Sequence, residues 1–283
     1  MVESMILFLL SQLASQPALL PASLPVVRVG TYSYPLYDRR VALEPLAAMI
    51  ERVSGRSTQI VLLDTPDALA DAVCSGDVDV AMTNLGAFVK IRSCPEVKAI
   101  AVLDTPSAVL DTYRGVLISR RDVGVATLDE LAARAGGLHY SEVLPGSTSG
   151  ALVQRAILRS VKTKPSSFLS VRQAGTHDAA LDDLLTGRSE VAAVAEEPWR
   201  NLLAKYPALA AQLHLLWRSE PLPVGPVVCK HSLRTSCDAI QSALLGPSGG
   251  DVAGSLSNGW RETEGAIRFR AYDPASYDAF RAE

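Results

Sequence analysis

The sequence has no excess of either charge. Its 283 residues hold 27 Lys and Arg against 30 Asp and Glu, a formal net charge of -3. Proteins that grip a nucleic-acid backbone carry a basic patch or stripe that neutralises phosphates. We therefore expect no nucleic-acid partner.

Long hydrophobic runs are also missing. The longest, residues 5–10, is broken by Ser11 and Gln12, well short of the roughly 20 apolar residues that span a bilayer. This run and the Pro-rich stretch after it are typical of a secretory signal peptide. We therefore expect residues 1–25 to form a leader and the protein to act in the periplasm. Because Glu3 stands where Lys or Arg is usual, a plain N-terminal strand is the alternative.

Cysteine is scarce, and its spacing does not fit a zinc site. The four Cys residues, at positions 74, 94, 229 and 237, form no C-x-x-C pair, and only His231 lies close to one of them. The sequence also lacks a cofactor fingerprint and an assembled catalytic triad. We expect no metal, no cofactor and no enzyme activity. The sequence leaves open whether the four cysteines form up to two disulfides, for which three pairings are possible.

Short apolar runs alternate with helical patterns along the chain. The expected strands are 26–30, 60–63, 78–82, 97–103, 114–119, 138–144, 168–171, 191–195 and 227–229. The expected helices are 43–53, 65–74, 128–135, 151–159, 179–185 and 236–245, with Thr65 or Asp67 and Ser236 as N-caps. This alternation predicts an α/β fold with mostly parallel sheets covered by helices.

The length of the chain favours two lobes rather than one domain. The β-α rhythm restarts near residue 113, and the Pro-rich segment 221–226 cannot lie inside a central sheet. We expect lobe 1 to comprise residues 26–112 and 224–283, and lobe 2 residues 113–223. The hinge should then lie in the two crossovers, at 112–115 and 221–226.

Residues 145–150, Pro-Gly-Ser-Thr-Ser-Gly, stand between a predicted strand and a predicted helix. Hydroxyls and free amides at a helix start favour an anion without needing lysine. We expect Ser147, Thr148, Ser149 and Gly150 to bind one, although a hydroxyl-rich helix cap without a ligand is the local alternative. With Thr148 in the middle position the segment is not a nucleophile elbow.

Further polar residues follow other predicted strands. Thr176 is a predicted N-cap, and a ring N–H of His177 could donate to the same anion. The alternative is a histidine without a ligand, since a lone His more often lies on the surface or packs against other side chains. Glu196 and Glu197 follow strand 191–195, where they could accept from an amine or simply be solvated. The remaining candidates for ligand contacts are Tyr34, Tyr37, Thr83, Asn84 and Tyr113.

Together these segments resemble the periplasmic receptors of phosphate, phosphite and phosphonate ABC importers, a type II periplasmic-binding-protein family. The match rests on 145–150, 175–180, 76–81 and 272–277. The resemblance implies two lobes with a hinge and an interlobe cleft, and a monomeric, non-enzymatic receptor that serves a membrane permease. It also implies that Ser147, Thr148, Ser149 and His177 contact the anion, and that an acid near Glu196 or Glu197 meets a substrate amine.

The sequence departs from this family after the third predicted strand. Such receptors usually show Gly-Pro and then Tyr there, whereas this chain has Asn84-Leu85 and then Phe88. The lobe 1 half of the site should therefore be less polar. A carrier of a lipid or sterol with a polar head, with Leu85 and Phe88 lining an enlarged apolar cleft, is the alternative function.

Overall fold

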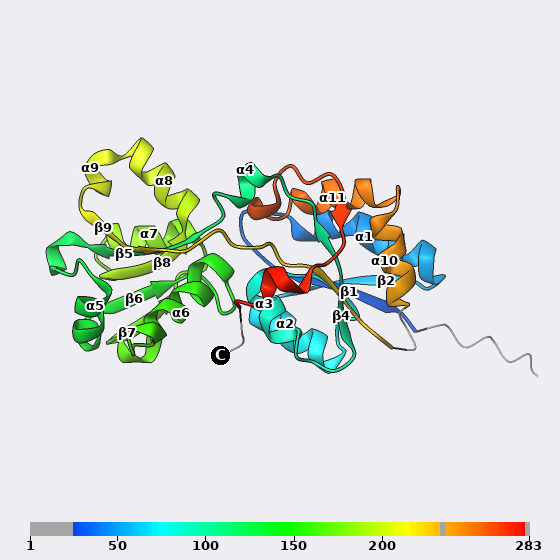
Figure 1. Cartoon of the computed structure of the whole chain (residues 1–283), viewed down its shortest axis with the longest axis horizontal. Coiled ribbons are helices and arrows are strands. Elements are labelled where there is room, and N and C mark those ends of the chain that lie inside the picture. The colour runs from blue at the N-terminus through cyan, green and yellow to red at the C-terminus, as the bar shows by residue number, and fades with distance from the viewer. Residues whose placement is uncertain (1–24, 233–235, 281–283) are drawn as a thin grey trace, which may run out of the picture.

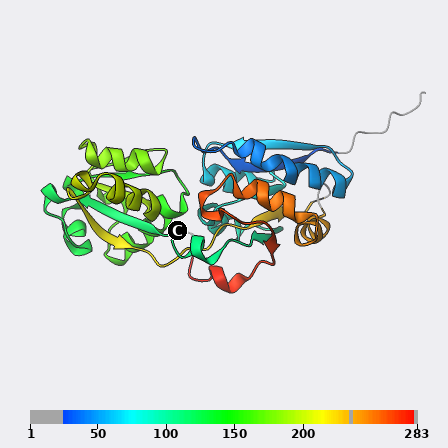
Figure 2. The ribbon, with the colours of Figure 1, turned by 90° about the horizontal axis from the view of Figure 1, so that it is seen from above.

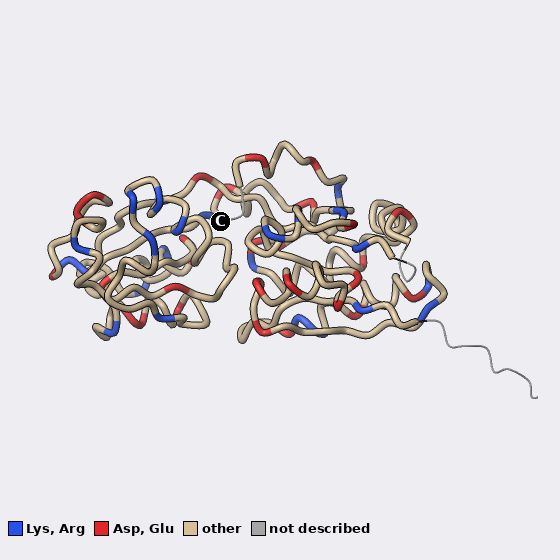
Figure 3. Tube along the Cα trace, turned by 90° about the horizontal axis from the view of Figure 1, so that it is seen from below, with Lys and Arg blue, Asp and Glu red and all other residues tan. Residues whose placement is uncertain are grey.

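Two separate sheets, each covered by helices, lie side by side in the computed structural model, which describes residues 25–232 and 236–280 (Figures 1 and 2). One sheet has the strand order β11-β4-β10-β3-β1-β2 and the other β7-β6-β8-β5-β9. We call the parts built on them lobe 1 and lobe 2. Acidic and basic residues are interspersed along both (Figure 3). The expected leader lies outside the described residues except for Pro25.

Lobe 1 contains the first four strands and the last two. Their bounds are β1 Val27–Tyr32, β2 Thr58–Leu63, β3 Val80–Met82, β4 Val97–Leu103, β10 Val227–Lys230 and β11 Phe269–Arg270. Strand β1 runs parallel to β2 and β3, whereas β10 runs antiparallel to β3 and β4. Strand β10 is reversed because it enters directly from lobe 2, at the sheet edge where β1 and β3 end.

Helices cover both faces of this sheet. They are α1 Arg39–Ser54, α2 Pro66–Ser75, α3 Leu85–Ile91, α4 Ser107–Leu110, α10 Cys237–Leu245 and α11 Gly249–Ser257, with short turns η5 Arg261–Thr263 and η6 Pro274–Tyr277. Helices α1, α10 and α11 pack on one face through Leu43, Ile240 and Leu256 respectively. Helices α2 and α3 cover the other through Leu69 and Phe88.

Lobe 2 repeats the arrangement with five strands. They are β5 Gly115–Arg120, β6 His139–Glu142, β7 Ser170–Gln173, β8 Val191–Ala195 and β9 Leu213–Arg218. Strand β6 runs parallel to β7 and β8, and β5, which arrives from lobe 1, runs antiparallel to β8 and β9. The sheets are therefore mixed and the α/β class is confirmed, while β9 was not expected from the sequence.

The helices of lobe 2 are α5 Leu128–Arg134, α6 Val153–Ser160, α7 His177–Leu185, α8 Glu196–Lys205 and α9 Pro207–Ala210. The predicted caps Thr65 and Thr176 both form, each hydroxyl accepting from the amide three residues on. Ser236 precedes α10 but makes no side-chain cap. The predicted helix 151–159 is α-helical only from Val153, because its first two residues belong to a π-helical turn, η3 Thr148–Leu152.

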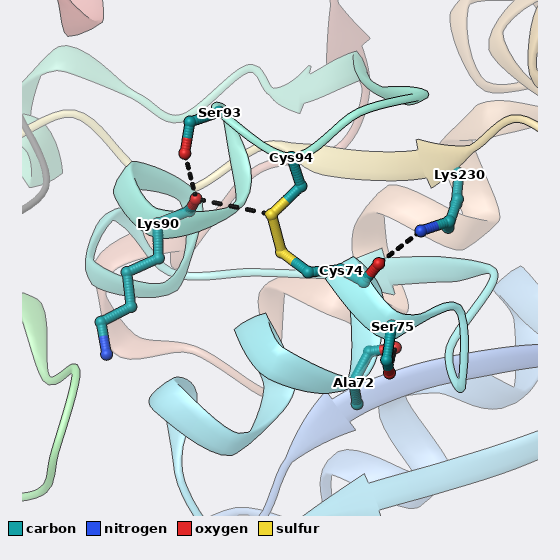
Figure 4. Close-up of a disulfide and its surroundings, with 7 residues drawn as sticks. All are labelled: Ala72, Cys74, Ser75, Lys90, Ser93, Cys94 and Lys230. Carbon is teal, nitrogen blue, oxygen red and sulfur yellow. Dashed lines mark hydrogen bonds between the residues drawn. A yellow bond between two sulfur atoms is a disulfide. The ribbon is translucent and has the colours of Figure 1, made fainter.

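Both disulfides left open by the sequence are present in lobe 1. Cys74 at the end of α2 is bonded to Cys94 before β4, and Cys229 of β10 to Cys237 of α10. Beside the first bridge the Lys230 ammonium donates to the Cys74 carbonyl oxygen, tying β10 to the same corner (Figure 4). The first bridge joins the end of α2 to the segment before β4, and the second joins the start of α10 to β10.

Candidate functional site

A cavity of about 410 Å³ lies between the two lobes, within the range typical of small-molecule sites. Lobe 1 contributes the end of β1, the turn after it, the start of α3 and η5. Lobe 2 contributes the turn between β6 and α6 and the starts of α7 and α8. Helix starts from lobe 2 thus face strand ends from lobe 1.

The turn before α6 brings three hydroxyls into this cleft. Ser147, Thr148 and Ser149 are buried and line the cavity. No side chain caps η3, so these hydroxyls are not used in the way that a plain helix cap would use them. Short π-helical turns occur often at functional sites, and this one places three consecutive donors along one wall.

His177 contributes a neutral ring donor from the start of α7. Its Nδ1 accepts a hydrogen bond from the Ala195 amide at 2.9 Å, so the ring proton must sit on Nε2. Burial lowers the pKa of His177 to about 4. At neutral pH the imidazole is uncharged, and its Nε2–H is the group left to donate to a ligand.

Tyrosine hydroxyls from both sides complete the polar wall. Burial raises the pKa of Tyr113, in the first crossover, well above the ordinary value, and the hydroxyls of Thr148 and Ser149 beside it oppose that shift. Tyr34 lies against the backbone of His177, and burial raises its pKa as well. Both phenols therefore keep their protons and remain donors.

A buried arginine that the sequence analysis missed supports the lobe 1 wall. Arg39 is 4% exposed, and its guanidinium carbon lies 4.1 Å from the Tyr32 ring centroid and 4.5 Å from that of Trp260. It donates from Nε to the Gly259 carbonyl and from Nη1 to that of Tyr32. Cation–π contacts and hydrogen bonds compensate a cation that would otherwise be costly to bury.

Glu262 was also missed, and it lines the same cavity. Burial raises its pKa, an effect that the positive charge of Arg39 opposes. Besides burial, the Glu262 charge raises the pKa of Tyr32 and Tyr113, so this carboxyl lies near both phenols. Only the fold could bring Arg39 and Glu262 together, since they are far apart in the sequence.

The other cleft-lining arginines are paired with carboxylates. Arg261 Nη2 of lobe 1 lies 2.9 Å from Glu197 Oε1 of lobe 2, and Arg114 Nη1 lies 3.6 Å from Glu220 Oε2. The cations at the cleft are therefore already compensated. An anion bound here would be held mainly by neutral donors.

Most of the predicted site residues meet at this cleft. Those that line it are Ser147, Thr148, Ser149, His177, Tyr34, Tyr37, Asn84, Tyr113 and Glu197. The structure places Gly150, Thr176 and Thr83 outside the lining. Gly150 accepts from the Val143 amide inside the turn, Thr176 caps α7, and the Thr83 hydroxyl donates to the Pro226 carbonyl at 2.6 Å.

The structure places two further expected contacts, Phe88 and Glu196, away from the lining. Phe88 is 2% exposed and packs edge-on against Tyr272 and Tyr277, with ring centroids 5.6 and 5.1 Å away. Glu196 is buried, and its Oε2 lies 2.8 Å from Arg218 Nη2. The first side chain belongs to the core of lobe 1, and the second is buried and forms an ion pair with the half-exposed Arg218.

Neither a metal cluster nor a membrane span is found in the described part of the chain. Residues 25–232 and 236–280 contain no group of three or more His, Cys, Asp or Glu that could hold a metal ion. Among the same residues, no helix combines the length and the apolar character needed to cross a bilayer.

Comparison with known proteins gives one family match and several similar structures. Residues 37–277 match the family model described as ABC transporter, phosphonate, periplasmic substrate-binding protein. No curated protein sequence matches the chain. PhnD1 from Prochlorococcus marinus (MIT 9301), solved with methylphosphonate, is 16% identical with a TM-score of 0.63, over 90% of this chain and 95% of that one.

Two other similar structures share the fold at equally low identity. A binding protein component of an ABC phosphonate transporter from Pseudomonas aeruginosa is 19% identical, with a TM-score of 0.63, over 90% of this chain and 84% of that one. A Xanthomonas citri protein bound to chloride is 17% identical, with a TM-score of 0.67, over 89% of this chain and 93% of that one.

These matches establish the fold as that of the type II periplasmic binding proteins, with two lobes of mixed sheet around a cleft. The family consists of binding proteins rather than enzymes. Since the family model covers most of the chain, the protein belongs to the periplasmic substrate-binding proteins of phosphonate ABC transporters.

Proposed function

We propose that this protein binds a small phosphonate-like anion in the interlobe cleft and delivers it to a membrane permease. The observation that carries the proposal is the convergence of Ser147, Thr148, Ser149, Tyr113 and the His177 Nε2–H on one cavity. Several neutral donors can satisfy the oxygens of a tetrahedral anion without an added cation. This anion subsite lies on the lobe 2 side.

The charge of the lining favours a ligand that also carries an amine. Arg39, Arg114 and Arg261 line the cavity, against the four carboxylates of Asp178, Glu197, Glu262 and Glu264. Because the arginines are already compensated, a free dianion would gain little from them, whereas an ammonium group would gain from a partly buried carboxylate. We assign this role to Glu262 rather than to Glu196, which is paired with Arg218.

Isothermal titration calorimetry with phosphate, phosphite, methylphosphonate and 2-aminoethylphosphonate tests the proposal. We expect 2-aminoethylphosphonate to bind most tightly, and Glu262→Gln to reduce its advantage over methylphosphonate. Glu264→Gln is the matched control, because Glu264 lines the same cavity but is exposed. If none of the four compounds releases or absorbs heat, the phosphonate assignment is wrong.

The lipid or sterol carrier receives no support from the cleft. It required Leu85 and Phe88 to line an enlarged apolar cavity, yet both are buried in the core of lobe 1. A cavity of about 410 Å³ with hydroxyl, imidazole and carboxyl groups in its wall fits a small polar molecule better.

The protein acts as a monomer in the periplasm, and its lobes close on the ligand about the crossovers at 112–115 and 221–226. Family membership supports the location and the permease partner. Two disulfides support the location further, because disulfides persist in oxidising compartments. Contacts from both lobes would stabilise the closed state, which is how ligand binding shifts such an equilibrium.

A further inference from the structure

The lobes touch directly beside the cleft, where the start of α3 meets the turn before η3. The Gly86 amide of lobe 1 donates to Thr148 Oγ1 of lobe 2 at 3.0 Å, in a buried position. Asn84 Nδ2 donates to the Gly146 carbonyl at 3.0 Å. We call the contact between Asn84, Gly86, Gly146 and Thr148 the interlobe clamp.

The clamp leaves no room for a side chain at position 86. A Cβ atom added to Gly86 would lie 2.0 Å from the Gly146 carbonyl oxygen and 2.9 Å from its carbon. Gly146 itself has φ +79°, and a Cβ there would lie 2.3 Å from Asp67 Oδ1. Because the obstacle at Gly86 is backbone, it could yield only if one lobe moved away from the other.

The clamp also accounts for an amide that α3 cannot satisfy by itself. Amides in the first turn of a helix have no partner within that helix. Asn84 Oδ1 accepts from the Ala87 amide at 2.8 Å within lobe 1, whereas the acceptor for Gly86 belongs to lobe 2. The hydrogen bond of the Ala87 amide is thus independent of closure, whereas that of the Gly86 amide forms only when the lobes meet.

Acceptance from Gly86 orients the Thr148 hydroxyl. Because Oγ1 accepts the Gly86 N–H, its own proton is directed away from that amide and is available to the cavity that Thr148 lines. An anion site that needs Thr148 as a donor therefore depends on lobe 1. The contribution of lobe 1 is the Gly86 backbone amide, which orients the Thr148 hydroxyl.

We propose that Asn84 and Gly86 are positioning residues, which couple closure of the lobes to the orientation of the Thr148 hydroxyl in the anion site. The coupling rests on the function proposed above, whereas the clamp can be tested without any ligand. Helix α3 thus has a second role besides packing on the sheet, because its first turn recognises the opposite lobe.

Hydrogen exchange of individual amides, followed by NMR, tests the clamp. In the wild type we expect both the Gly86 and Ala87 amides to be protected. Thr148→Val should remove the protection of Gly86 and leave that of Ala87, and Thr148→Ser, which keeps the oxygen, should retain both. Protection that appears only with saturating 2-aminoethylphosphonate supports the proposal equally. A Gly86 amide that is unprotected with and without this probe, or protected in Thr148→Val, overturns it.

Gly86→Ala tests the coupling to the anion site. We expect it to weaken the binding of 2-aminoethylphosphonate by about 100-fold, because closure becomes costly. Gly254→Ala in α11 is the control, since a Cβ there would meet nothing within 4 Å. Unchanged affinity in Gly86→Ala overturns the coupling. If the wild type binds none of the phosphonates, the proposed function fails, and the exchange experiment alone decides the clamp.

Discussion

The imidazole of His177 shows how a single side chain gains its role from its surroundings. The residue starts α7, and its Nδ1 is occupied by the Ala195 amide at 2.9 Å. That bond fixes the tautomer, and burial keeps the ring neutral. A neutral donor of defined direction suits reversible binding of the anion proposed above.

Removing one donor from the anion subsite should weaken binding measurably. We expect Ser149→Ala and His177→Ala each to reduce the affinity for the phosphonate by about 1 to 3 kcal/mol, because each removes a hydrogen bond to a charged group. Calorimetric titration measures the change. Thr176→Ser, which keeps the α7 cap outside the cleft, should bind like the wild type. Wild-type affinity in both alanine variants would refute the site.

The lowered pKa of His177 predicts a loss of stability in acid. The folded-state pKa is about 4 against the ordinary 6.5, so between these values the unfolded chain binds more protons. The free energy of unfolding should therefore fall as pH falls from about 6.5 towards about 4. Chemical denaturation across this range should show a shallower fall for His177→Gln, and an identical slope would contradict the assignment.

Among the helices, α2 lies against lobe 2 at its start and is fixed by a disulfide at its other end. Helix α2 starts beside the Pro145 carbonyl, which accepts from the Asp67 amide at 3.3 Å, and ends at the Cys74–Cys94 disulfide. The bridge closes a loop of chain that contains β3 and α3. It thus holds together the part of lobe 1 that carries the clamp.

The double variant Cys74→Ala, Cys94→Ala should be less stable than the wild type. A bridge with a sequence separation of 20 restricts the unfolded chain by about 3 kcal/mol in the chain-entropy model. Urea denaturation measures the loss, with the wild type under the same non-reducing conditions as reference. An unchanged free energy of unfolding would mean that the packing of α2 and α3 alone holds this corner.

Sequence patterns predicted the elements better than the faces that their side chains occupy. Alternating apolar runs located most strands, and hydroxyls before apolar runs located the caps Thr65 and Thr176. They could not show that Phe88 turns into the core of lobe 1, because α3 is buried on several sides at once. Glu196 was misplaced for a similar reason, since its partner Arg218 comes from β9, a strand that the pattern did not reveal.

The whole molecule brings together residues that share no local pattern. Arg39 opens α1 and Glu262 lies in η5 near the C-terminus, yet both line the same wall. Arg261 and Glu197 form an ion pair across the cleft from opposite lobes. Together with the clamp, this pair makes the shape of the site depend on how the lobes are placed.

Closure on a ligand should therefore be visible in the size of the molecule. The ligand-free lobes should open and reclose, with the clamp formed in the closed form. We expect the radius of gyration from small-angle X-ray scattering to decrease when 2-aminoethylphosphonate is added, because contacts from both lobes favour that closed form. The double variant Ser149→Ala, His177→Ala should keep its ligand-free radius at the same probe concentration. A wild-type radius that does not change while calorimetry reports binding would contradict hinge closure.

The sequence by itself determined the α/β class, the hydroxyl-rich turn at 145–150 and the position of His177 at a helix start, since caps and apolar periodicity are local properties. Only the tertiary structure decided which donors share a cavity, that Arg39 and Glu262 join them, and that Gly86 meets Thr148. The reason is geometric: these contacts join two lobes, and no short stretch of sequence records the distance between residues that the chain brings together by crossing from one lobe to the other.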